Sequence, residues 1–300
     1  MIGYFSFPFF AMGSECILHI YALKPEIANE LAQASIAEVI RIEQRYSRFR
    51  SESLLSEINR TAASGGMLEV DEETAGLLDY AFACYKMSLG LFDISAGSLY
   101  NAWDFSVARL PEQSQIESLL RRVGLEKVNW SRPLLQFPLP NMSFDFGGIG
   151  KEYASDRVAD LCLSNGTKHG LIDLGGDIRI IGPHPDGSAW RVGLRDPAHP
   201  DSTREIIEIK NGGIATSGDY ERYIEVAGQR YCHILNPKSG WPVRDLSSVS
   251  VVADSCLVAG SIATIAMLKG RDAINWLDEL GVAHAWVDNQ GQRGGNLFRT

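Results

Sequence analysis

Two runs rich in β-branched and aromatic residues, at 4–10 and 14–22, open the chain with Met12 and Gly13 between them. This composition predicts two β-strands or one bent strand. From Pro25 to about Arg45 the apolar residues recur every three or four positions, which predicts a long amphipathic helix with Pro in its first turn. The apolar positions expected to define this helix are Ile27, Leu31, Ala34, Ile36, Val39 and Ile40.

Five more helices are predicted by the same spacing together with start and stop signals. One has Asp71 as its N-cap and Gly90 at its end, and another follows the glycines before Lys151. Short apolar runs separated by Gly, Asn, Asp and Pro predict strands, including a hairpin broken at Gly175 and Gly176. The helices are expected at about 72–89, 111–123, 151–164, 257–268 and 272–280, and strands at 171–181, within 190–250, at 249–253, at 283–287 and after a turn at 289–291.

The order of these elements predicts an α+β fold with largely antiparallel sheets and inserted helices, because strands come in hairpin-like runs and helices in blocks. No repeat of 20–50 residues is visible, so a repeat architecture is not expected. No linker rich in Pro, Gly or Ser divides the chain. We therefore expect a single domain over residues 1–300, with two intimately packed lobes as the alternative.

Composition narrows the class of protein. The 300 residues are 45% hydrophobic and 22% charged, which is typical of a soluble globular chain and excludes a disordered one. The net charge of −9 argues against sequence-independent binding of nucleic acid, which needs a basic face. No apolar run approaches the roughly 20 residues that span a bilayer, so no transmembrane segment is expected.

The cysteines and the N-terminus bear on the compartment. Five cysteines are dispersed without a Cys-x-x-Cys pair, which favours a reducing compartment and gives no zinc or redox motif. The apolar start of the chain has no Lys or Arg before it and is interrupted by Pro8, unlike a signal peptide. The sequence as written therefore predicts a cytoplasmic protein, or a periplasmic one if a leader is missing.

The strongest chemical signal is the glycine-rich segment from Asp145 to Lys151, which leads directly into a predicted helix. Backbone N–H groups at a helix start and an adjacent lysine favour an anion, so this segment predicts a phosphate-binding loop. Glu152 follows the lysine where a Walker loop has Ser or Thr, and the glycine spacing is not that of a dinucleotide fold. The alternative is a glycine-rich turn without a ligand.

Four other segments carry polar or small residues with a structural alternative for each. Residues 214–222 combine small hydroxyls with a carboxylate, but could equally form a hairpin turn, and residues 90–98 could be a plain loop. His233 ends a strand beside a turn-rich loop, and a lone His is more often structural. Thr264 lies in an apolar helix, where its hydroxyl can bond to the helix itself. No Gly-x-Ser-x-Gly or His-Glu-x-x-His motif supports a hydrolase of those classes.

Taken together and in this order, the segments resemble the ApbE family of FAD:protein FMN transferases. The resemblance runs from about residue 10 to residue 270 and implies an ApbE-like fold with a ligand cleft between two closely packed lobes. The family's ordered motifs have counterparts at Met12-Gly-Ser14, Ser47-Arg-Phe-Arg50, Ser53-Leu-Leu with Asn59, Gly90–Asp93, Asp145–Tyr153, Gly175-Gly-Asp177, Ala215–Tyr220, His233–Gly240 and Ala259–Thr264.

The resemblance implies an activity. Members of the family bind FAD, pass its FMN part to a Thr hydroxyl of a target protein and release AMP. A divalent cation, usually Mg²⁺, polarises the pyrophosphate. Targets in the family include subunits of membrane redox pumps, whereas no nucleic-acid partner is implied. Members are often periplasmic and lipid-anchored, yet this sequence shows no signal peptide and no lipobox cysteine.

The resemblance also implies site residues, of which none is assigned a catalytic role. The residues expected to contact FAD are Met12 and Phe49 near the flavin, Ala96, Gly97 and Ser98 through their backbone, Gly147, Lys151 and Tyr153 in the nucleotide site, His233 and Ile234 beside it, and Ser217 and Asp219. The metal ligands expected are the carbonyl of Gly150 and the hydroxyl of Thr264.

The chain departs from the family pattern at the metal site. The family's Asp four residues before the Thr is Gly260 here, which removes the anionic ligand of the cation. Glu152 replaces the family's Gly after the lysine, and we hypothesise that it partly restores the lost charge. Two functions therefore stay open: an active flavin transferase, or an FAD-binding relative with weak or no transferase activity. Smaller departures are Asp177 for Asn, Asn236 for Asp and Ser239 for Thr.

Overall fold

The computed structural model describes residues 2–297, and an eight-stranded sheet with antiparallel neighbours forms its centre. The order of the strands across this sheet is β1-β2-β6-β7-β10-β13-β14-β15. The predicted α+β class with largely antiparallel sheets is confirmed. The strands are β1 Gly3–Ala11, β2 Ser14–Ala22, β6 Gly170–Leu174, β7 Asp177–Gly182, β10 Gly213–Gly218, β13 Leu246–Ala253, β14 Ala283–Asp288 and β15 Arg293–Gly295.

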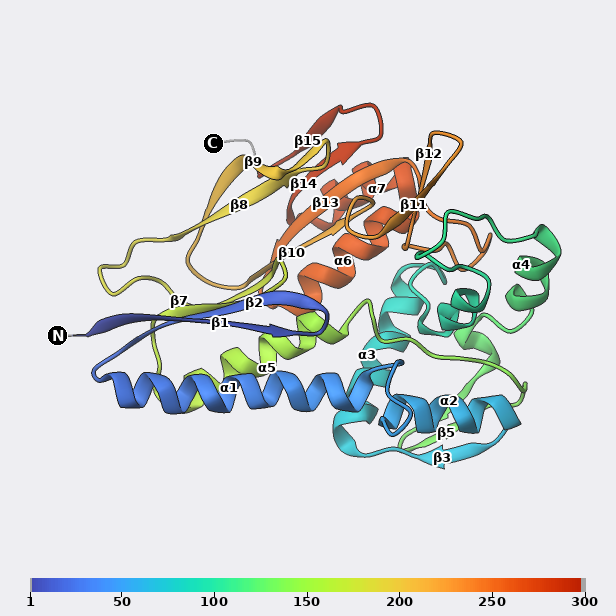
Figure 1. Ribbon diagram of the computed structural model, residues 1–300, viewed down its shortest axis with the longest axis horizontal. Helices are drawn as coiled ribbons and strands as arrows, with labels where there is room; N and C mark the ends of the chain where they lie inside the picture. The colour runs from blue at the N-terminus through green and yellow to red at the C-terminus, as the bar shows by residue number, and fades with distance from the viewer. Residues whose placement is uncertain (1, 298–300) are drawn as a thin grey trace.

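Both faces of the sheet are covered. Helices α1 (Pro25–Tyr46), α5 (Gly150–Ser164) and α6 (Cys256–Lys269) lie along one face (Figure 1). A ribbon of β8 (Trp190–Asp196) and β9 (His199–Ile209) packs on the other, around Leu171 and Ile180. Ile172 belongs to the cluster under α1 and α5, so neighbouring residues of β6 enter different cores, as strand alternation requires. After α6, a short 3-10 turn leads into α7 (Ala273–Leu280).

Helix α1 begins at Pro25 as predicted, but its buried face differs from the expected one. Ile27 is 49% exposed and Ile40 is 37% exposed, and Ala34 also faces solvent. The small residues Ala28, Ala32 and Ser35 are buried together with larger apolar ones, because close packing against α5 requires side chains that fit the space between the helices. The buried residues are Ala28, Leu31, Ala32, Ser35, Val39, Ile42 and Tyr46.

Residues 47–149 form an insertion between α1 and α5, seen in cyan and green in Figure 1. Its core elements are α2 (Leu54–Ser64), α3 (Glu72–Met87) and a three-stranded sheet in the order β3-β5-β4. A 3-10 segment, η1 (Ile94–Asn101), and α4 (Gln113–Leu120) pack with the small hairpin β11–β12 around Trp103 and Leu235. The remaining bounds are β3 Met67–Glu69, η2 Leu125–Lys127, β4 Asn129–Ser131, β5 Leu134–Gln136, β11 Tyr223–Val226, β12 Gln229–Cys232 and η3 Gly270–Asp272.

The sequence pattern missed the short elements of this insertion. Helix α2 begins after Ser53, whose side chain accepts a hydrogen bond from the Ser56 N–H, and the strands β3, β4 and β5 have three residues each. Helix α4 is shorter than the predicted 111–123. Among residues 2–297 no helix combines the length and the apolar character that crossing a membrane requires.

Candidate active site

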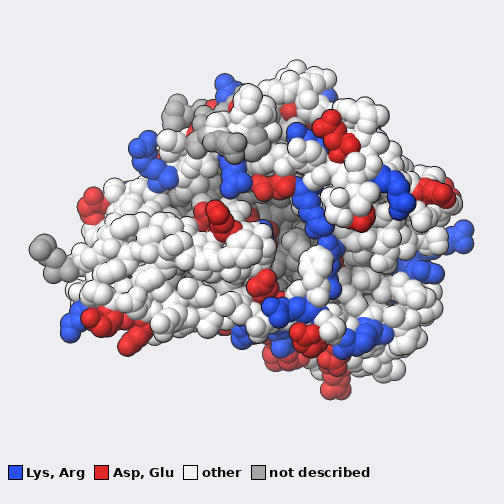
Figure 2. Space-filling model, in the orientation of Figure 1, with Lys and Arg blue, Asp and Glu red and all other residues white. Residues whose placement is uncertain are grey.

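A cavity of about 900 Å³ opens where the insertion meets the central sheet, and segments from eight parts of the chain line it. Figure 2 shows a hollow near the middle of one face, with both acidic and basic side chains around it. Most of the site residues expected from the sequence lie in this cavity. They are Met12, Phe49, Ala96, Gly97, Gly147, Gly150, Lys151, Ser217, His233, Ile234 and Thr264.

Side chains of Asn59 and Arg48, and a hydrogen bond within the loop, fix the glycine-rich loop before α5. The side chain of Asn59 donates to the Phe144 carbonyl at 3.0 Å and accepts from the Phe144 N–H at 2.7 Å. Asp145 accepts from the Gly147 N–H at 2.8 Å and pairs with Arg48, also at 2.8 Å. The carboxylate of Asp145 therefore shapes the loop, and Lys151 enters the cavity from the first turn of α5.

Gly97 explains how η1 comes so close to this loop. A Cβ at Gly97 would lie 2.8 Å from the Ser143 carbonyl oxygen and 3.0 Å from the Asp145 nitrogen. Only glycine permits that approach, which the Asp145 N–H completes by donating to the Ile94 carbonyl at 2.8 Å. The predicted backbone wall of Ala96 and Gly97 is thus fixed against the glycine loop.

Two hairpin turns form another part of the wall. Met12, with a φ of 52°, and Gly13 connect β1 to β2, and Met12 lines the cavity. Gly175, in the turn between β6 and β7, lies beside Ser14, because β2 and β6 are paired neighbours. Lys151 reaches the same place: its Nζ is 3.5 Å from the position of a Cβ at Gly175. The lysine charge therefore stands between the two turns.

Hydroxyls and a histidine complete the cavity. Ser217 of β10 and Thr264 of α6 are hydrogen-bonded at 3.0 Å. Burial lowers the pKa of His233, whose Nδ1 lies 3.1 Å from the carbonyl oxygen of Arg222. A neutral ring with its hydrogen on Nδ1 donates to that carbonyl, which leaves Nε2 as an acceptor.

Two carboxylates, from Glu152 and Asp177, line the cavity beside these hydroxyls. Glu152 is 7% exposed, and its Oε2 has no hydrogen-bond partner. Burial raises the pKa of Glu152 to about 7. Burial and the nearby charge of Glu152 also raise the pKa of Asp177 well above its ordinary value. A pair of this kind is held at a cost to the fold unless a cation or proton joins it.

Gly260 lies directly behind Glu152. A Cβ at Gly260 would be 2.5 Å from both Cγ and Oε1 of Glu152. The Glu152 side chain thus occupies the space that the Cβ of any other residue at position 260 would need. A side chain at position 260 and the present conformation of Glu152 therefore exclude each other, which we call the steric exchange between the two positions.

The arginines of the cavity were not among the predicted site residues. Arg48, Arg50 and Arg222 line it, and the Arg48 guanidinium lies 3.9 Å from the centre of the Tyr100 ring. Phe49 lies at the rim and is 80% exposed, and the Arg48 guanidinium is also 4.8 Å from the centre of its ring. The signal was available in the Arg-Phe-Arg run of residues 48–50, which alternates two cations with an aromatic ring.

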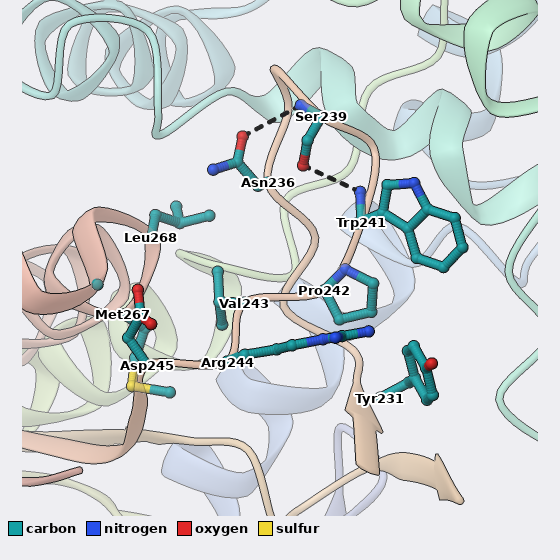
Figure 3. Close-up of a pocket in the computed structure, with 11 residues that line it drawn as sticks. Tyr231, Asn236, Ser239, Trp241, Pro242, Val243, Arg244, Asp245, Met267 and Leu268 are labelled. Carbon is teal, nitrogen blue, oxygen red and sulfur yellow. Dashed lines mark hydrogen bonds between the residues drawn. The ribbon is translucent and has the colours of Figure 1, made fainter. Parts of the chain in front are cut away.

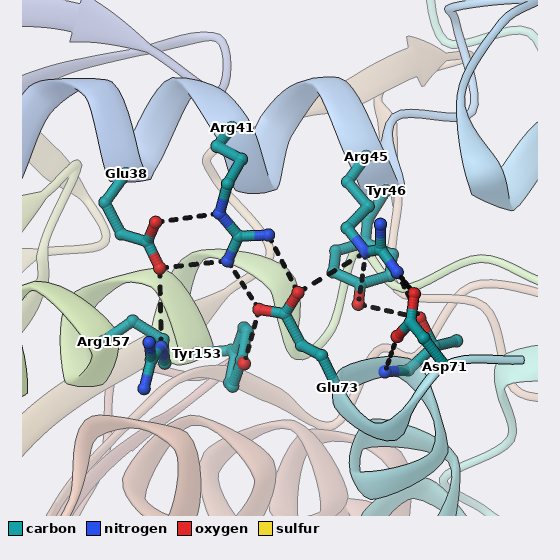
Figure 4. Close-up of polar contacts among 9 residues, drawn as sticks. Glu38, Arg41, Arg45, Tyr46, Asp71, Glu73, Tyr153 and Arg157 are labelled. Carbon is teal, nitrogen blue, oxygen red and sulfur yellow. Dashed lines mark hydrogen bonds and ion pairs between the residues drawn. The ribbon is translucent and has the colours of Figure 1, made fainter.

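Three expected site residues do not line the cavity. Ser98, a residue of η1, is fully buried, and its Oγ has no partner. Asp219 pairs with Arg230 at 3.1 Å, while burial raises its pKa. Tyr153 lies on another side of α5, where its hydroxyl donates to Glu73 at 2.8 Å (Figure 4).

Figure 4 shows that Glu73 joins α1, α3 and α5. It accepts two hydrogen bonds from Arg41, at 2.6 and 2.8 Å, in addition to that of Tyr153. The Arg41 hydrogen bonds are the main reason that the pKa of Glu73 falls to about 2. This network holds the first turn of α5, and therefore Lys151, against the insertion.

We expect Glu73→Gln to lower the free energy of unfolding by about 1–2 kcal/mol at pH 7, because the charged hydrogen bonds with Arg41 are lost. The folded pKa lies below the ordinary 4.5, so this stabilisation is present above that value and disappears as the pH falls toward 2. Urea unfolding at pH 7 and pH 4 measures it, and the difference between variant and wild type should shrink at pH 4. Glu72→Gln is the control, since the Glu72 side chain is 84% exposed; an equal loss there would contradict the assignment.

A second, smaller pocket of about 550 Å³ adjoins the cavity at Leu268 (Figure 3). Asn236 accepts a hydrogen bond from the Ser239 N–H at 3.3 Å, and Ser239 accepts one from the Trp241 N–H at 3.2 Å. These residues therefore stabilise the turn after His233.

Comparison with known proteins gives the family. The model of the ApbE family matches residues 12–286. The chain belongs to the ApbE family. It is 30% identical over 260 residues to the FAD:protein FMN transferase of Vibrio cholerae, covering 84% of this chain and 78% of the relative. It is also 30% identical over 240 residues to the enzyme of that name from Escherichia coli K12, covering 77% and 68%.

Solved structures agree with this family assignment. The ApbE protein of Thermotoga maritima has a TM-score of 0.90 at 30% identity, over 98% of this chain and 97% of that one. The flavin transferase ApbE of Vibrio cholerae has a TM-score of 0.87 at 26% identity, with the same coverage.

Proposed function

We propose that this protein transfers the FMN part of FAD to a threonine hydroxyl of a target protein and releases AMP. The observation that carries the proposal is the convergence of Lys151, His233 and Thr264, from three separate motifs, on one cavity. Its volume of about 900 Å³ is within the range of small-molecule sites. The relatives named FAD:protein FMN transferase supply the substrate class.

The chemistry needs charge neutralisation and an oriented hydroxyl. The threonine oxygen forms a bond to the phosphorus of the FMN half, while the bond from that phosphorus to the bridging oxygen breaks and AMP leaves with that oxygen. Lys151, Arg48 and Arg222 provide positive charge at the cavity wall. His233 offers Nε2 as an acceptor for a hydroxyl proton.

The residues present fit a divalent cation. Among the described residues no group of three or more His, Cys, Asp or Glu side chains is placed to hold a metal ion. The unpartnered Oε2 of Glu152 nevertheless belongs to a residue that lines the same cavity as Thr264 and Gly150. When bound there, Mg²⁺ would withdraw charge from the phosphate oxygens. Glu152, Thr264 and the carbonyl of Gly150 are the groups that would hold it.

The alternative, an FAD-binding relative with little turnover, rested on the missing Asp at position 260. We favour transfer because the Glu152 carboxylate lies in the space left by Gly260. A redox-pump subunit as the target remains part of the proposal, drawn from the family alone.

The test is AMP release from FAD in the presence of an acceptor peptide containing a Ser/Thr-Gly-Ala-Thr-like segment. We expect release and covalent flavin on the peptide with Mg²⁺, and neither after EDTA treatment. Tight FAD binding without AMP release under both conditions would overturn the proposal in favour of the binding protein. Flavin on the peptide after a Thr→Val change in its acceptor position would contradict the threonine assignment.

A further inference from the structure

We propose that Glu152 and Asp177 together form a two-carboxylate site that binds a divalent cation before FAD enters. The inference deepens the proposed function, since the cation would act at the FAD pyrophosphate. Its test is nevertheless cation binding to the FAD-free protein, which does not depend on turnover.

One carboxylate oxygen of Glu152 has no hydrogen-bond partner. Glu152 is more than nine-tenths buried and lines the cavity, yet its Oε2 receives no hydrogen bond. A buried carboxylate oxygen without a partner loses its hydration and regains nothing from the protein. The geometry at Gly260 explains why this side chain is turned inward, but leaves its charge without a counterpart.

A second carboxylate, that of Asp177, lines the same cavity. Asp177 begins β7, which α5 packs against, and its carbonyl accepts a hydrogen bond from Ser155 at 3.1 Å. Its side chain lines the same cavity as Glu152, and the two charges interact. An amide in place of Asp177 would relieve the repulsion, but the chain has the acid there. Two adjacent acids therefore call for a bound positive charge.

Two hydroxyl groups add neutral oxygen atoms to the cavity lining. Thr264 and Ser217, 3.0 Å apart, line the cavity together with the carboxylates. Hard divalent cations prefer such all-oxygen surroundings, and affinity rises with the number of carboxylates. Lys151 is a positive charge near both Glu152 and Asp177. One lysine charge cannot balance two carboxylate charges, so the site has a net negative charge.

The experiment uses Mn²⁺ as a paramagnetic probe, titrated into the FAD-free full-length protein. The loss of the free-ion EPR signal gives the number of sites and the Kd, and Mg²⁺ competition shows that both ions share the site. We expect one Mn²⁺ per chain, displaced by Mg²⁺. Glu152→Gln and Asp177→Asn should each weaken binding at least about tenfold.

The matched control is Asp173→Asn. Asp173 is a neighbouring carboxylate that does not line the cavity, and its Oδ1 accepts from the Gly176 N–H at 2.7 Å, which Asn can also do. This variant should bind Mn²⁺ within about threefold of wild type, since only charge at a distance is lost. Thermal unfolding of each variant in EDTA shows that it is folded.

Three results would overturn the inference. They are no binding at about 1 mM Mn²⁺, binding unchanged in both Glu152→Gln and Asp177→Asn, or an equal loss in Asp173→Asn. The first would mean that the two acids share a proton instead. If Mn²⁺ binds as expected but no flavin is transferred, the cation site stands and the proposed function fails.

Discussion

Gly260→Asp alone should destabilise the protein by about 3 kcal/mol, although it introduces the residue that the sequence resemblance led us to expect at this position. The new Cβ would lie 2.5 Å from Cγ and Oε1 of Glu152, so that side chain must be displaced. The change also places a third carboxylate beside Glu152 and Asp177. Urea unfolding in EDTA measures the loss.

The double variant Glu152→Gly/Gly260→Asp should recover most of that stability. It removes the overlap and returns the local charge to that of wild type, so the two substitutions should be strongly non-additive. It should also bind Mn²⁺, which Glu152→Gly alone should not. Additive effects within about 0.5 kcal/mol would contradict the steric exchange.

Gly76→Asp is the control for placing Asp within a helix. Gly76 is an exposed position inside α3, and a Cβ there meets nothing within 4 Å. We expect a change within about 0.5 kcal/mol. A loss equal to that of Gly260→Asp would show that an Asp inside a helix, rather than its overlap with Glu152, causes the effect.

Lys151→Met should slow AMP release by about 100- to 1,000-fold and weaken FAD binding. The substitution keeps an unbranched side chain that is one atom shorter, and it removes the charge at the start of α5, between the two hairpin turns. FAD affinity from flavin fluorescence and single-turnover AMP release measure the two effects separately. Lys168→Met, at an exposed position beyond α5, should change neither.

Lys151→Met should not weaken cation binding, in contrast to its effect on FAD binding. Since Lys151 offsets the charges of Glu152 and Asp177, its loss should leave Mn²⁺ binding equal or tighter. Weaker Mn²⁺ binding together with weaker FAD binding would indicate general damage to the cavity. Transfer within about threefold of wild type would remove Lys151 from the proposed mechanism.

The sequence carries the local structure better than the placement of side chains. Alternation, glycine turns and helical spacing are properties of neighbouring residues, so the central hairpins, α1, α3, α5 and α6 could be predicted. The face that α1 buries could not, because α5, which lies more than 100 residues away, decides it. The three-residue strands β3 to β5 are too short to carry a period.

The same limit applies to the candidate site. Motif order indicates which segments approach a ligand, and the cavity does contain most of them. It does not indicate which side of a helix a residue occupies, so Tyr153 was expected at the nucleotide and instead contacts Glu73. The contact of Glu152 with position 260 links α5 to α6, and only the folded chain brings those helices together.

The chain enters the insertion of residues 47–149 after α1 and leaves it before α5. Residues at both of these connections line the cavity. Any partial opening that detaches the insertion therefore dismantles the binding site at the same moment. The apparent affinity for FAD is then the intrinsic affinity multiplied by the fraction of molecules in which the insertion is docked. A substitution far from FAD, at the α1–α3 contact for example, can in this way weaken FAD binding without touching the ligand.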